Sequence, residues 1–435
     1  MDLILTLIAS YFIINKRKLE WVLVIIMALA TNLFQVSKVF ANTFVFPNIT
    51  DAALILIFLM FVVFYNKKHG YQSLKPICKI TMVFFVYIAF VIIIDLIING
   101  ISFVSVIKTS RHWLCLLILF IIPKFPYNAL YKALRITFYI TIIASSIIIL
   151  EYIIGTEYFT KTMVENGVKR GALPSYYAFF YTLLVFTNYY SFSKTKKYVF
   201  LAILIVSQLV SVTRSISLAI AIGIALCMWY LSKEKIVSLL KLGGFCIIIY
   251  FSSFALPSLN KRFNEAFEEI SRIEQSYKQL DSDGNMTFRL YMLVERYQYL
   301  KTNPQYYLFG IGNVIEQDFP TKFFIGGFNE EMQRPTQLDT GDITWPLIIL
   351  RLGMIGLVLY MILIFSFIRF KCKLFDFKLY IITKAYLLST LMVISFAGSH
   401  LARGEFWIMP VICIVMISQT SFYKKEKQLI KNQEQ

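Results

Sequence analysis

The amino-acid sequence predicts an all-α, polytopic integral membrane protein with about 12–13 transmembrane helices and one large extracytoplasmic loop that carries helices. Of its 435 residues, 58% are hydrophobic and only 16% are charged, whereas a soluble domain usually has about 45–50% apolar and ~25% charged residues. The apolar residues also occur in long runs rather than in alternation with polar ones. This composition excludes most soluble enzyme classes and a secreted disulfide scaffold.

The apolar runs give the expected positions of the spans, because a helix of about 20 mostly apolar residues crosses the ~30 Å hydrocarbon core of a bilayer. Spans are expected at 2–15, 21–40, 51–66, 80–98, 112–123, 136–154, 175–192, 198–213, 215–231, 242–256, 343–368, 379–398 and 406–422. We therefore expect helices 1–10 within residues 1–256, the large extracytoplasmic loop at 257–342, helices 11–13 within 343–422 and a cytoplasmic tail at 423–435.

The basic residues predict the orientation of these spans. The 43 Lys and Arg exceed the 25 Asp and Glu, which gives a net charge of +18. The basic residues cluster after every second span, as in the cytoplasmic loops of membrane proteins. The clusters lie at 16–18, 67–79, 124–135, 194–197, 233–241, 369–384 and 424–431. The charge therefore implies no nucleic-acid partner, and the loops at 155–174 and 257–342 are expected on the extracytoplasmic side.

The large loop is expected to carry two helices. Residues 259–280 place apolar side chains at helical spacing with charges between them, which is typical of an amphipathic helix on a membrane surface or on the bundle. A second helix is expected at about 287–302, because Asn303-Pro304 ends it. Tyr297 and Tyr306 are candidates for stacking on sugar rings, although interfacial tyrosines are common in membrane proteins.

Four arginines are candidates for an anion-binding site. Arg214 stands between two apolar runs, where an arginine costs ~2.5–3.5 kcal/mol unless its side chain reaches the interface. Arg170 comes shortly before a span. Arg289 and Arg296 are seven residues apart and share one helix face, which is either a solvated face or a binding face. Guanidinium groups bind phosphate oxygens bidentately, so together these arginines could hold a pyrophosphate.

Four short motifs resemble those of bacterial O-antigen polymerases and ligases. They follow the order expected for that superfamily and cover about residues 155–360, while the architecture resembles the superfamily over the whole chain. The motifs are Arg170-Gly171-Ala172-Leu173-Pro174-Ser175-Tyr176-Tyr177-Ala178, Thr213-Arg214-Ser215, Arg289 with Pro304 and Leu308-Phe309-Gly310-Ile311-Gly312, and Gly341-Asp342-Ile343 with Arg351-Leu352-Gly353-Met354-Ile355-Gly356-Leu357.

The resemblance implies a metal-independent glycosyltransferase of the GT-C kind in the bacterial cytoplasmic (inner) membrane, without a cofactor. Its substrates would be undecaprenyl-diphosphate-linked oligosaccharide repeat units, which it would join into a surface polysaccharide. Arg170, Arg214 and Arg289 would bind the diphosphate, with Arg296 beside them, and Arg289 would also act in catalysis. Membrane lipid and a chain-length regulator protein are the other partners that the family implies.

Asp342 is the candidate base, because partial desolvation at the membrane entry suits a carboxylate to accept a proton. Its alternative role is the N-cap of the following span. For the ligase branch, the resemblance implies a histidine near the end of the large loop. The histidines of this chain, which are His69, His112 and His400, lie elsewhere, and this favours a polymerase. An O-antigen ligase and a flippase for lipid-linked oligosaccharides are the alternative functions, although the two halves of the chain do not match as in many transporters.

Overall fold

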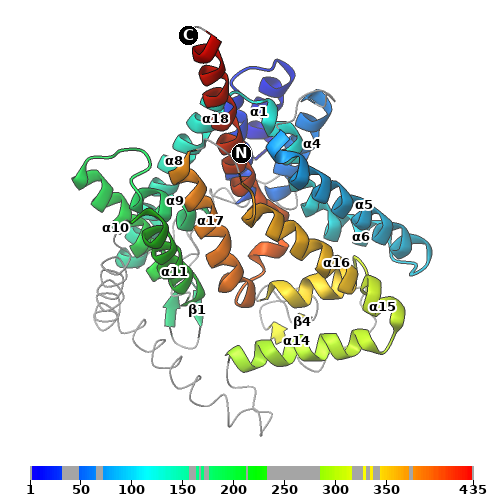
Figure 1. Cartoon of the computed structure of the whole chain (residues 1–435). Coiled ribbons are helices and arrows are strands. Elements are labelled where there is room, and N and C mark those ends of the chain that lie inside the picture. The colour runs from blue at the N-terminus through cyan, green and yellow to red at the C-terminus, as the bar shows by residue number, and fades with distance from the viewer. Residues whose placement is uncertain are drawn as a thin grey trace.

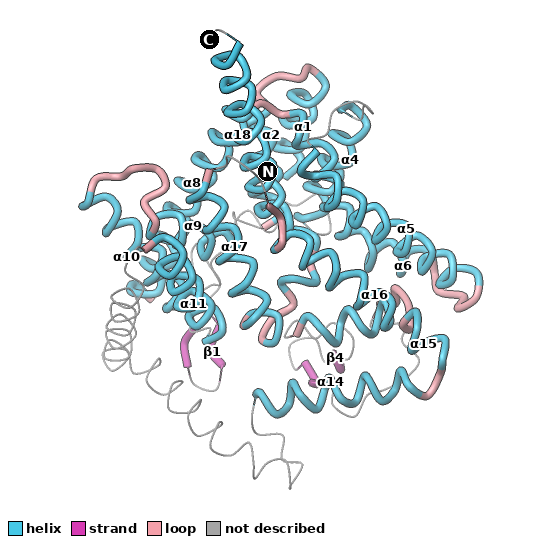
Figure 2. The backbone as a smooth tube through the Cα atoms, viewed as in Figure 1, coloured by secondary structure: helices cyan, strands magenta, loops and turns pink. Residues whose placement is uncertain are grey.

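The computed structural model shows a bundle of helices with the C-terminus at one end and α14 at the other (Figures 1 and 2). The residues that the structure describes are 2–31, 49–64, 72–155, 163–165, 168–170, 176–211, 214–232, 285–315, 327–329, 334–336, 343–371 and 376–433. Residues 32–40 of the predicted span at 21–40, the predicted span at 242–256, the predicted amphipathic helix at 259–280, and His69 lie outside these residues.

The elements of the first half are α1 (Asp2–Ile14), α2 (Leu19–Ala30), α4 (Ile49–Phe64), η1 (Gln72–Leu74), α5 (Lys75–Ile97), α6 (Phe103–Ser110), η2 (Arg111–Leu117), α7 (Ile118–Ile121), η3 (Ile122–Lys124), α8 (Tyr127–Ile154), β1 (Met163–Glu165), β2 (Val168–Arg170), α9 (Tyr176–Phe186), α10 (Lys194–Val210) and α11 (Arg214–Leu231). Those of the second half are α14 (Asn285–Lys301), α15 (Pro304–Phe309), β3 (Gly327–Asn329), β4 (Arg334–Thr336), α16 (Thr344–Ile368), α17 (Phe377–Met392), η5 (Ile394–Phe396), η6 (His400–Ala402), η7 (Gly404–Trp407) and α18 (Ile408–Gln433).

The predicted fold class, an all-α polytopic membrane protein, is confirmed. Among the described residues, five helical segments are long and apolar enough to cross a membrane: Lys75–Ile97, Phe103–Lys124, Tyr127–Ile154, Thr344–Ile368 and Phe377–Phe396. Shorter apolar helices accompany them, among them α1, α2 and α11. The described strands form two short antiparallel pairs, β1 with β2 and β3 with β4.

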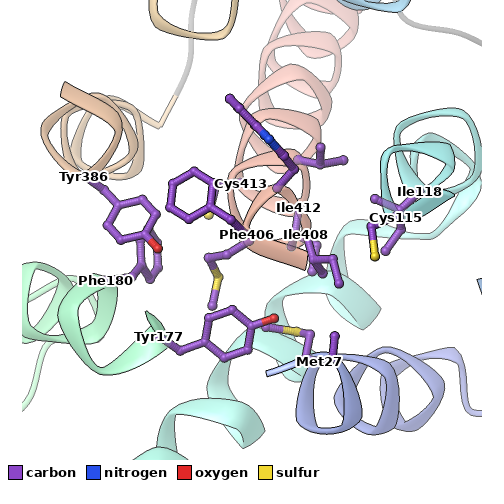
Figure 3. Close-up of a cluster of buried hydrophobic side chains, with 14 of the residues drawn as sticks. Met27, Cys115, Ile118, Tyr177, Phe180, Tyr386, Phe406, Ile408, Ile412 and Cys413 are labelled. Carbon is purple, nitrogen blue, oxygen red and sulfur yellow. The ribbon is translucent and has the colours of Figure 1, made fainter. Parts of the chain in front are cut away.

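An apolar core holds the bundle together. Side chains from α2, η2, α9, α17, η7 and α18 converge in it (Figure 3). Tyr177, Phe180 and Phe406 are all almost completely buried there, and the ring of Phe406 stacks on that of Tyr386 at 5.3 Å. Helices inside a bilayer associate mainly through van der Waals packing, and the close packing of these side chains unites elements that are far apart in the sequence.

Several predicted spans have different bounds in the structure. The span expected at 136–154, for example, begins at Tyr127, the first residue of α8. The segment expected at 112–123 begins earlier, at Phe103, and continues through a 3-10 turn to Lys124. Its first turns contain polar side chains that lower the hydropathy of the sequence. Within the helix these hydroxyls are satisfied by backbone carbonyls, since Thr109 Oγ1 donates to Ser105 O over 2.9 Å and Ser110 Oγ to Val106 O over 2.7 Å. The expected helix at 287–302, by contrast, is confirmed as α14.

The chain between α14 and α16 is fixed to the bundle by Asp95, near the end of α5. The Asp95 carboxylate is buried and accepts hydrogen bonds from the backbone N–H of Asn313 over 2.8 Å and from its side-chain amide over 3.0 Å. On the other side of this turn, the N–H of Ile311 donates to Leu350 O of α16 over 2.7 Å. The turn therefore joins α5, α15 and α16.

α16 changes direction at Gly353, which has φ 64° and ψ −170°. This backbone conformation is almost restricted to glycine. The turn after α15 lies so close here that a Cβ on Gly353 would be 2.5 Å from the backbone nitrogen of Gly310. Gly353 thus allows the first half of α16 to run beside α14 while the second half continues into the bundle (Figure 1).

We expect Gly353→Ala to lower the unfolding temperature of the purified protein by several degrees, because the added methyl group strains the backbone and collides with the turn after α15. Gly100→Ala is the matched control, since Gly100 also has a positive φ of 63° but has open space where the Cβ would be. Thermal unfolding in detergent measures both variants. An equal effect of the two would show that the close approach contributes nothing.

Candidate functional site

α14 places Arg289 and Arg296 on the side that faces the bundle. Met292 and Leu300 are buried on this helix, and α14 packs along α16 (Figures 1 and 2). Arg296 has no exposed surface at all, and Arg289 is half-buried. The two arginines therefore do not belong to a solvated helix face, which was one of the two interpretations of their spacing.

The structure separates the roles of these two arginines. Arg296 Nη1 forms an ion pair with Glu295 Oε2 at 3.0 Å, and a buried charge is stable only when it is paired. The Nε of Arg289 is buried without a hydrogen-bond partner among the described residues, as is the Nε of Arg296, so the ion pair with Glu295 is what distinguishes the two arginines. Arg289 is thus the better placed of the two to bind an anionic ligand, while Arg296 anchors the helix.

Three other predicted site residues lie wholly or partly outside the described residues. Arg170 is the last residue of β2, and Arg214 is the first residue of α11, but their side chains lie outside the described residues. Asp342 lies entirely outside them, immediately before Ile343 at the start of α16. The proximity of these three side chains to Arg289 stays a prediction.

The predicted sugar-binding tyrosines belong to an aromatic group where α14 turns into α15. The ring of Tyr297 lies 6.2 Å from that of Tyr307, and Tyr306 stacks with Tyr299 at 6.3 Å. The turn is held by Asn303, whose side chain accepts a hydrogen bond from Gln305 N over 2.9 Å. Tyr297 and Tyr306 are both half-buried, so each keeps part of its ring surface available.

A group of charged residues from α4, η2, α16 and the 403–405 segment, which we call the α16 charge cluster, is linked by electrostatic interactions. Arg351 and Arg403 both act electrostatically on the same residue, His112 of η2. Glu405 is in turn within the electrostatic reach of Arg403 and of the ion pair between Arg111 and Asp51, whose atoms are 3.0 Å apart. The cluster is defined as Asp51, Arg111, His112, Arg351, Arg403 and Glu405.

Sequence reasoning missed this cluster because its members come from four separate parts of the chain. One signal could have found it, since charged residues inside apolar runs are rare and usually functional. Arg351 within α16 and Glu405 before α18 both satisfy this criterion.

Aromatic packing makes the surroundings of the cluster rigid. Trp113 packs edge-on against Phe84 at 5.1 Å and against Tyr360 at 5.3 Å. Trp407 Nε1 donates to Tyr360 Oη over 3.0 Å, and Tyr360 donates to the carbonyl of Leu401. The backbone of Gly404 lies directly against the carbonyl of His112. The 399–407 segment is thereby held between η2 and α16.

His400 lies beside the start of α16. Thr344 Oγ1 donates to Gly398 O over 2.8 Å, and Gly398 lies close to the imidazole of His400. Burial, and to a smaller extent the charge of Arg403, lowers the pKa of His400 to about 3. His400 is therefore neutral near pH 7. Within the part of the chain that the structure describes, no three His, Cys, Asp or Glu side chains are grouped so that they could hold a metal ion.

The lowered pKa of His400 predicts a loss of stability in acid. The unfolded chain binds a proton at His400 below about pH 6.5, whereas the folded chain does so only near pH 3. Stability is therefore fully present above pH 6.5 and falls as the pH decreases, by at most about 1.4 kcal/mol per pH unit. We expect His400→Gln to lose less stability than the wild type between pH 7.5 and pH 5 in thermal unfolding. An identical loss would contradict this assignment.

Comparison with known proteins agrees with the architecture. The family model described as O-antigen ligase matches residues 199–361. The matched stretch contains most of α10, all of α11, α14 and α15, and α16 as far as residue 361, and hence Arg214, Arg289 and Arg351. No curated protein matches the chain. The match and the polytopic helical fold support membership of the O-antigen ligase/polymerase superfamily.

Proposed function

We propose that the chain is a glycosyltransferase that polymerises undecaprenyl-diphosphate-linked oligosaccharide repeat units into a surface polysaccharide. The observation that carries this proposal is Arg289, a half-buried arginine whose Nε lacks a partner among the described residues. It lies on a helix that belongs to the family-matched segment. A lipid diphosphate is an anion of the right chemistry for a guanidinium at a membrane surface.

In the proposed reaction, a hydroxyl oxygen of one lipid-linked unit attacks the anomeric carbon of the other. The bond between this carbon and the diphosphate oxygen breaks, and the diphosphate leaves with the electron pair. Arg170, Arg214 and Arg289 stabilise the developing negative charge, which is where electrostatic catalysis acts. Asp342 takes the proton of the attacking hydroxyl. The guanidinium groups supply the positive charge, so the proposed reaction needs no metal ion.

The site is proposed to face the extracytoplasmic side of the bacterial inner membrane. The basic clusters of the sequence favour this orientation by the positive-inside rule. Tyr297 and Tyr306 are then candidates for contact with the saccharide, because both lie on the α14–α15 segment that also carries Arg289. A regulator of chain length is the expected protein partner.

An O-antigen ligase is the second candidate. The description of the matching family favours it, and the same arginines would bind the same donor diphosphate. The two activities differ in the acceptor, which is a second lipid-linked repeat unit for a polymerase and a finished core for a ligase.

Deletion of the gene in the source bacterium separates these candidates, with surface polysaccharide analysed by gel electrophoresis. For a polymerase we expect the long-chain ladder to disappear while a single-repeat species remains on its final acceptor. If no repeat reaches the surface, ligation or flipping has failed and the polymerase proposal is wrong.

Replacement of the predicted diphosphate ligands tests the site. We expect Arg170→Gln, Arg214→Gln and Arg289→Gln each to abolish chain extension at unchanged protein abundance in the membrane. Arg289→Lys should also be poor, because an ammonium group keeps the charge but not the bidentate geometry. Arg369→Gln is the matched control, since Arg369 is exposed at the far end of α16. Normal-length polymer from all three Gln variants would refute the assignment.

A further inference from the structure

We propose that residues 304–315 form a re-entrant segment, which enters the outer leaflet of the membrane beside α5, contacts its acyl chains and returns. The sequence predicts these residues as part of an extracytoplasmic loop instead. The partner is the hydrocarbon of the bilayer, and the contact surface is the side of α15 that carries Leu308. The inference concerns the path of the chain, so it stands whether or not the proposed function is correct.

The first argument is the order in which α15 contacts the region of α5. Near the start of α15, Gln305 Nε2 donates over 3.1 Å to Oδ1 of Asn99, which follows the end of α5 at Ile97. At the end of α15, the ring of Phe309 lies 5.5 Å from that of Phe90. Phe90 precedes Ile97 by about two helical turns, or roughly 10 Å along the axis of α5. α15 therefore runs inward along the spanning helix.

The turn after α15 leads back towards the end of α5. The N–H of Asn313 donates over 2.8 Å to Oδ2 of Asp95, which is closer to the end of α5 than Phe90 is. The N–H of Ile315 donates over 2.9 Å to Ser105 Oγ, near the start of α6. An inward contact followed by an outward one on the same helix is the path of a re-entrant segment.

The second argument is the face of α5 that α15 joins. α5 is long and apolar enough to cross a membrane, and its exposed apolar side chains recur at helical spacing, so they form one stripe towards lipid. The members of this stripe are Met82, Val83, Val86, Phe90, Ile93 and Ile97. Phe309 packs edge-on against Phe90, and the neighbouring Leu308 is 41% exposed. The surface of Leu308 is therefore continuous with the lipid-facing stripe.

The third argument is the hydrogen bonding of the turn after α15. Non-helical backbone at membrane depth must be buried in protein, because hydrocarbon offers no hydrogen-bond partner. The turn is buried from Gly310 to Val314. Its N–H groups donate to oxygen atoms of Tyr306, Leu350, Asp95, Gly312 and Ser105, from Gly310, Ile311, Asn313, Val314 and Ile315 respectively. A loop in water needs no such acceptors, since water molecules take their place.

The fourth argument is the order of residue types from α14 into α15. Lys301 and Thr302 are polar and exposed, Tyr306 and Tyr307 follow, and the exposed apolar Leu308 comes last. Tyrosines are enriched at the boundary between membrane and water. This order is the one expected of a chain that passes from water through the interface into hydrocarbon.

The re-entrant segment also sets the position of α14 relative to the membrane. Only Thr302 and Asn303 separate α14 from α15, and α14 lies at the opposite end of the bundle from the C-terminus (Figure 1). An α15 that is anchored in the outer leaflet therefore holds α14, the helix of Arg289, at the membrane surface. An anionic lipid can then approach this helix by lateral diffusion while its chain stays in the bilayer.

A spin label in place of Leu308 tests the contact with lipid. p-Acetylphenylalanine replaces Leu308 in the full chain and reacts with a ketone-specific nitroxide, so the native cysteines stay unchanged. In phosphatidylcholine nanodiscs, power-saturation EPR compares collisions with oxygen, which concentrates in hydrocarbon, and with a water-soluble nickel chelate. Val86 of the α5 stripe is the lipid control, and the exposed Thr302 is the water control. We expect the oxygen-to-nickel collision ratio at Leu308 to match that at Val86 and to be several-fold higher than at Thr302.

Two results of this measurement overturn the proposal. Frequent collisions with nickel at Leu308 would place the side chain in water. Few collisions with either reagent would show that protein, from this chain or from a second copy, covers it.

A pair of unlabelled variants provides an independent test. A carboxylate that faces hydrocarbon is costly, whereas one in water is not. We therefore expect Leu308→Asp to lower the unfolding temperature in nanodiscs by several degrees, and the matched control Thr302→Asp to leave it unchanged. Equal unfolding temperatures of the two variants would also overturn the proposal.

Discussion

The arrangement of the candidate site depends on the carboxylate of Asp95. This group is buried, and a buried carboxylate is tolerated only when hydrogen bonds replace its water. Asn313 supplies two of them, which fixes the turn after α15 to the end of α5. Because α15 and α14 precede this turn directly, the same contact sets where α14 lies along α16. The position of Arg289 is thus determined by a carboxylate on a different helix.

The cost of charge in an apolar environment explains the pairing of the other ionised groups. Arg296 is fully buried beside Glu295, and Arg111 is paired with Asp51. Breaking a buried pair typically costs about 3–5 kcal/mol, which applies to the fully buried Arg296, whereas the partly exposed pair of Arg111 and Asp51 contributes less. Arg289 and Arg403 differ from them, because each retains surface and neither has an ion-pair partner among the described residues. This contrast separates the arginines that hold the fold from those that can bind a ligand.

The sequence was sufficient for the fold class and for α14, since long apolar runs and a proline after a periodic segment are local signals. It was not sufficient for the start of the Phe103–Lys124 segment, where hydroxyl groups satisfied within the helix resemble loop residues in sequence. The sequence also predicted the same role for Arg296 and Arg289, because helical spacing shows that two residues share a face. It does not show that Arg296 forms an ion pair with Glu295. The sequence did not predict the α16 charge cluster, because no local pattern connects Asp51, Arg111, Arg351 and Arg403. The roles of Arg170, Arg214 and Asp342 stay predictions.

The kink at Gly353 gives α16 a central place in the proposed reaction. Its first half packs along α14, the helix that carries Arg289. The end at Thr344 is bonded to Gly398 and directly follows Asp342 in the chain. In the proposed reaction, the base Asp342 therefore directly precedes the half-helix along which the helix of Arg289 packs.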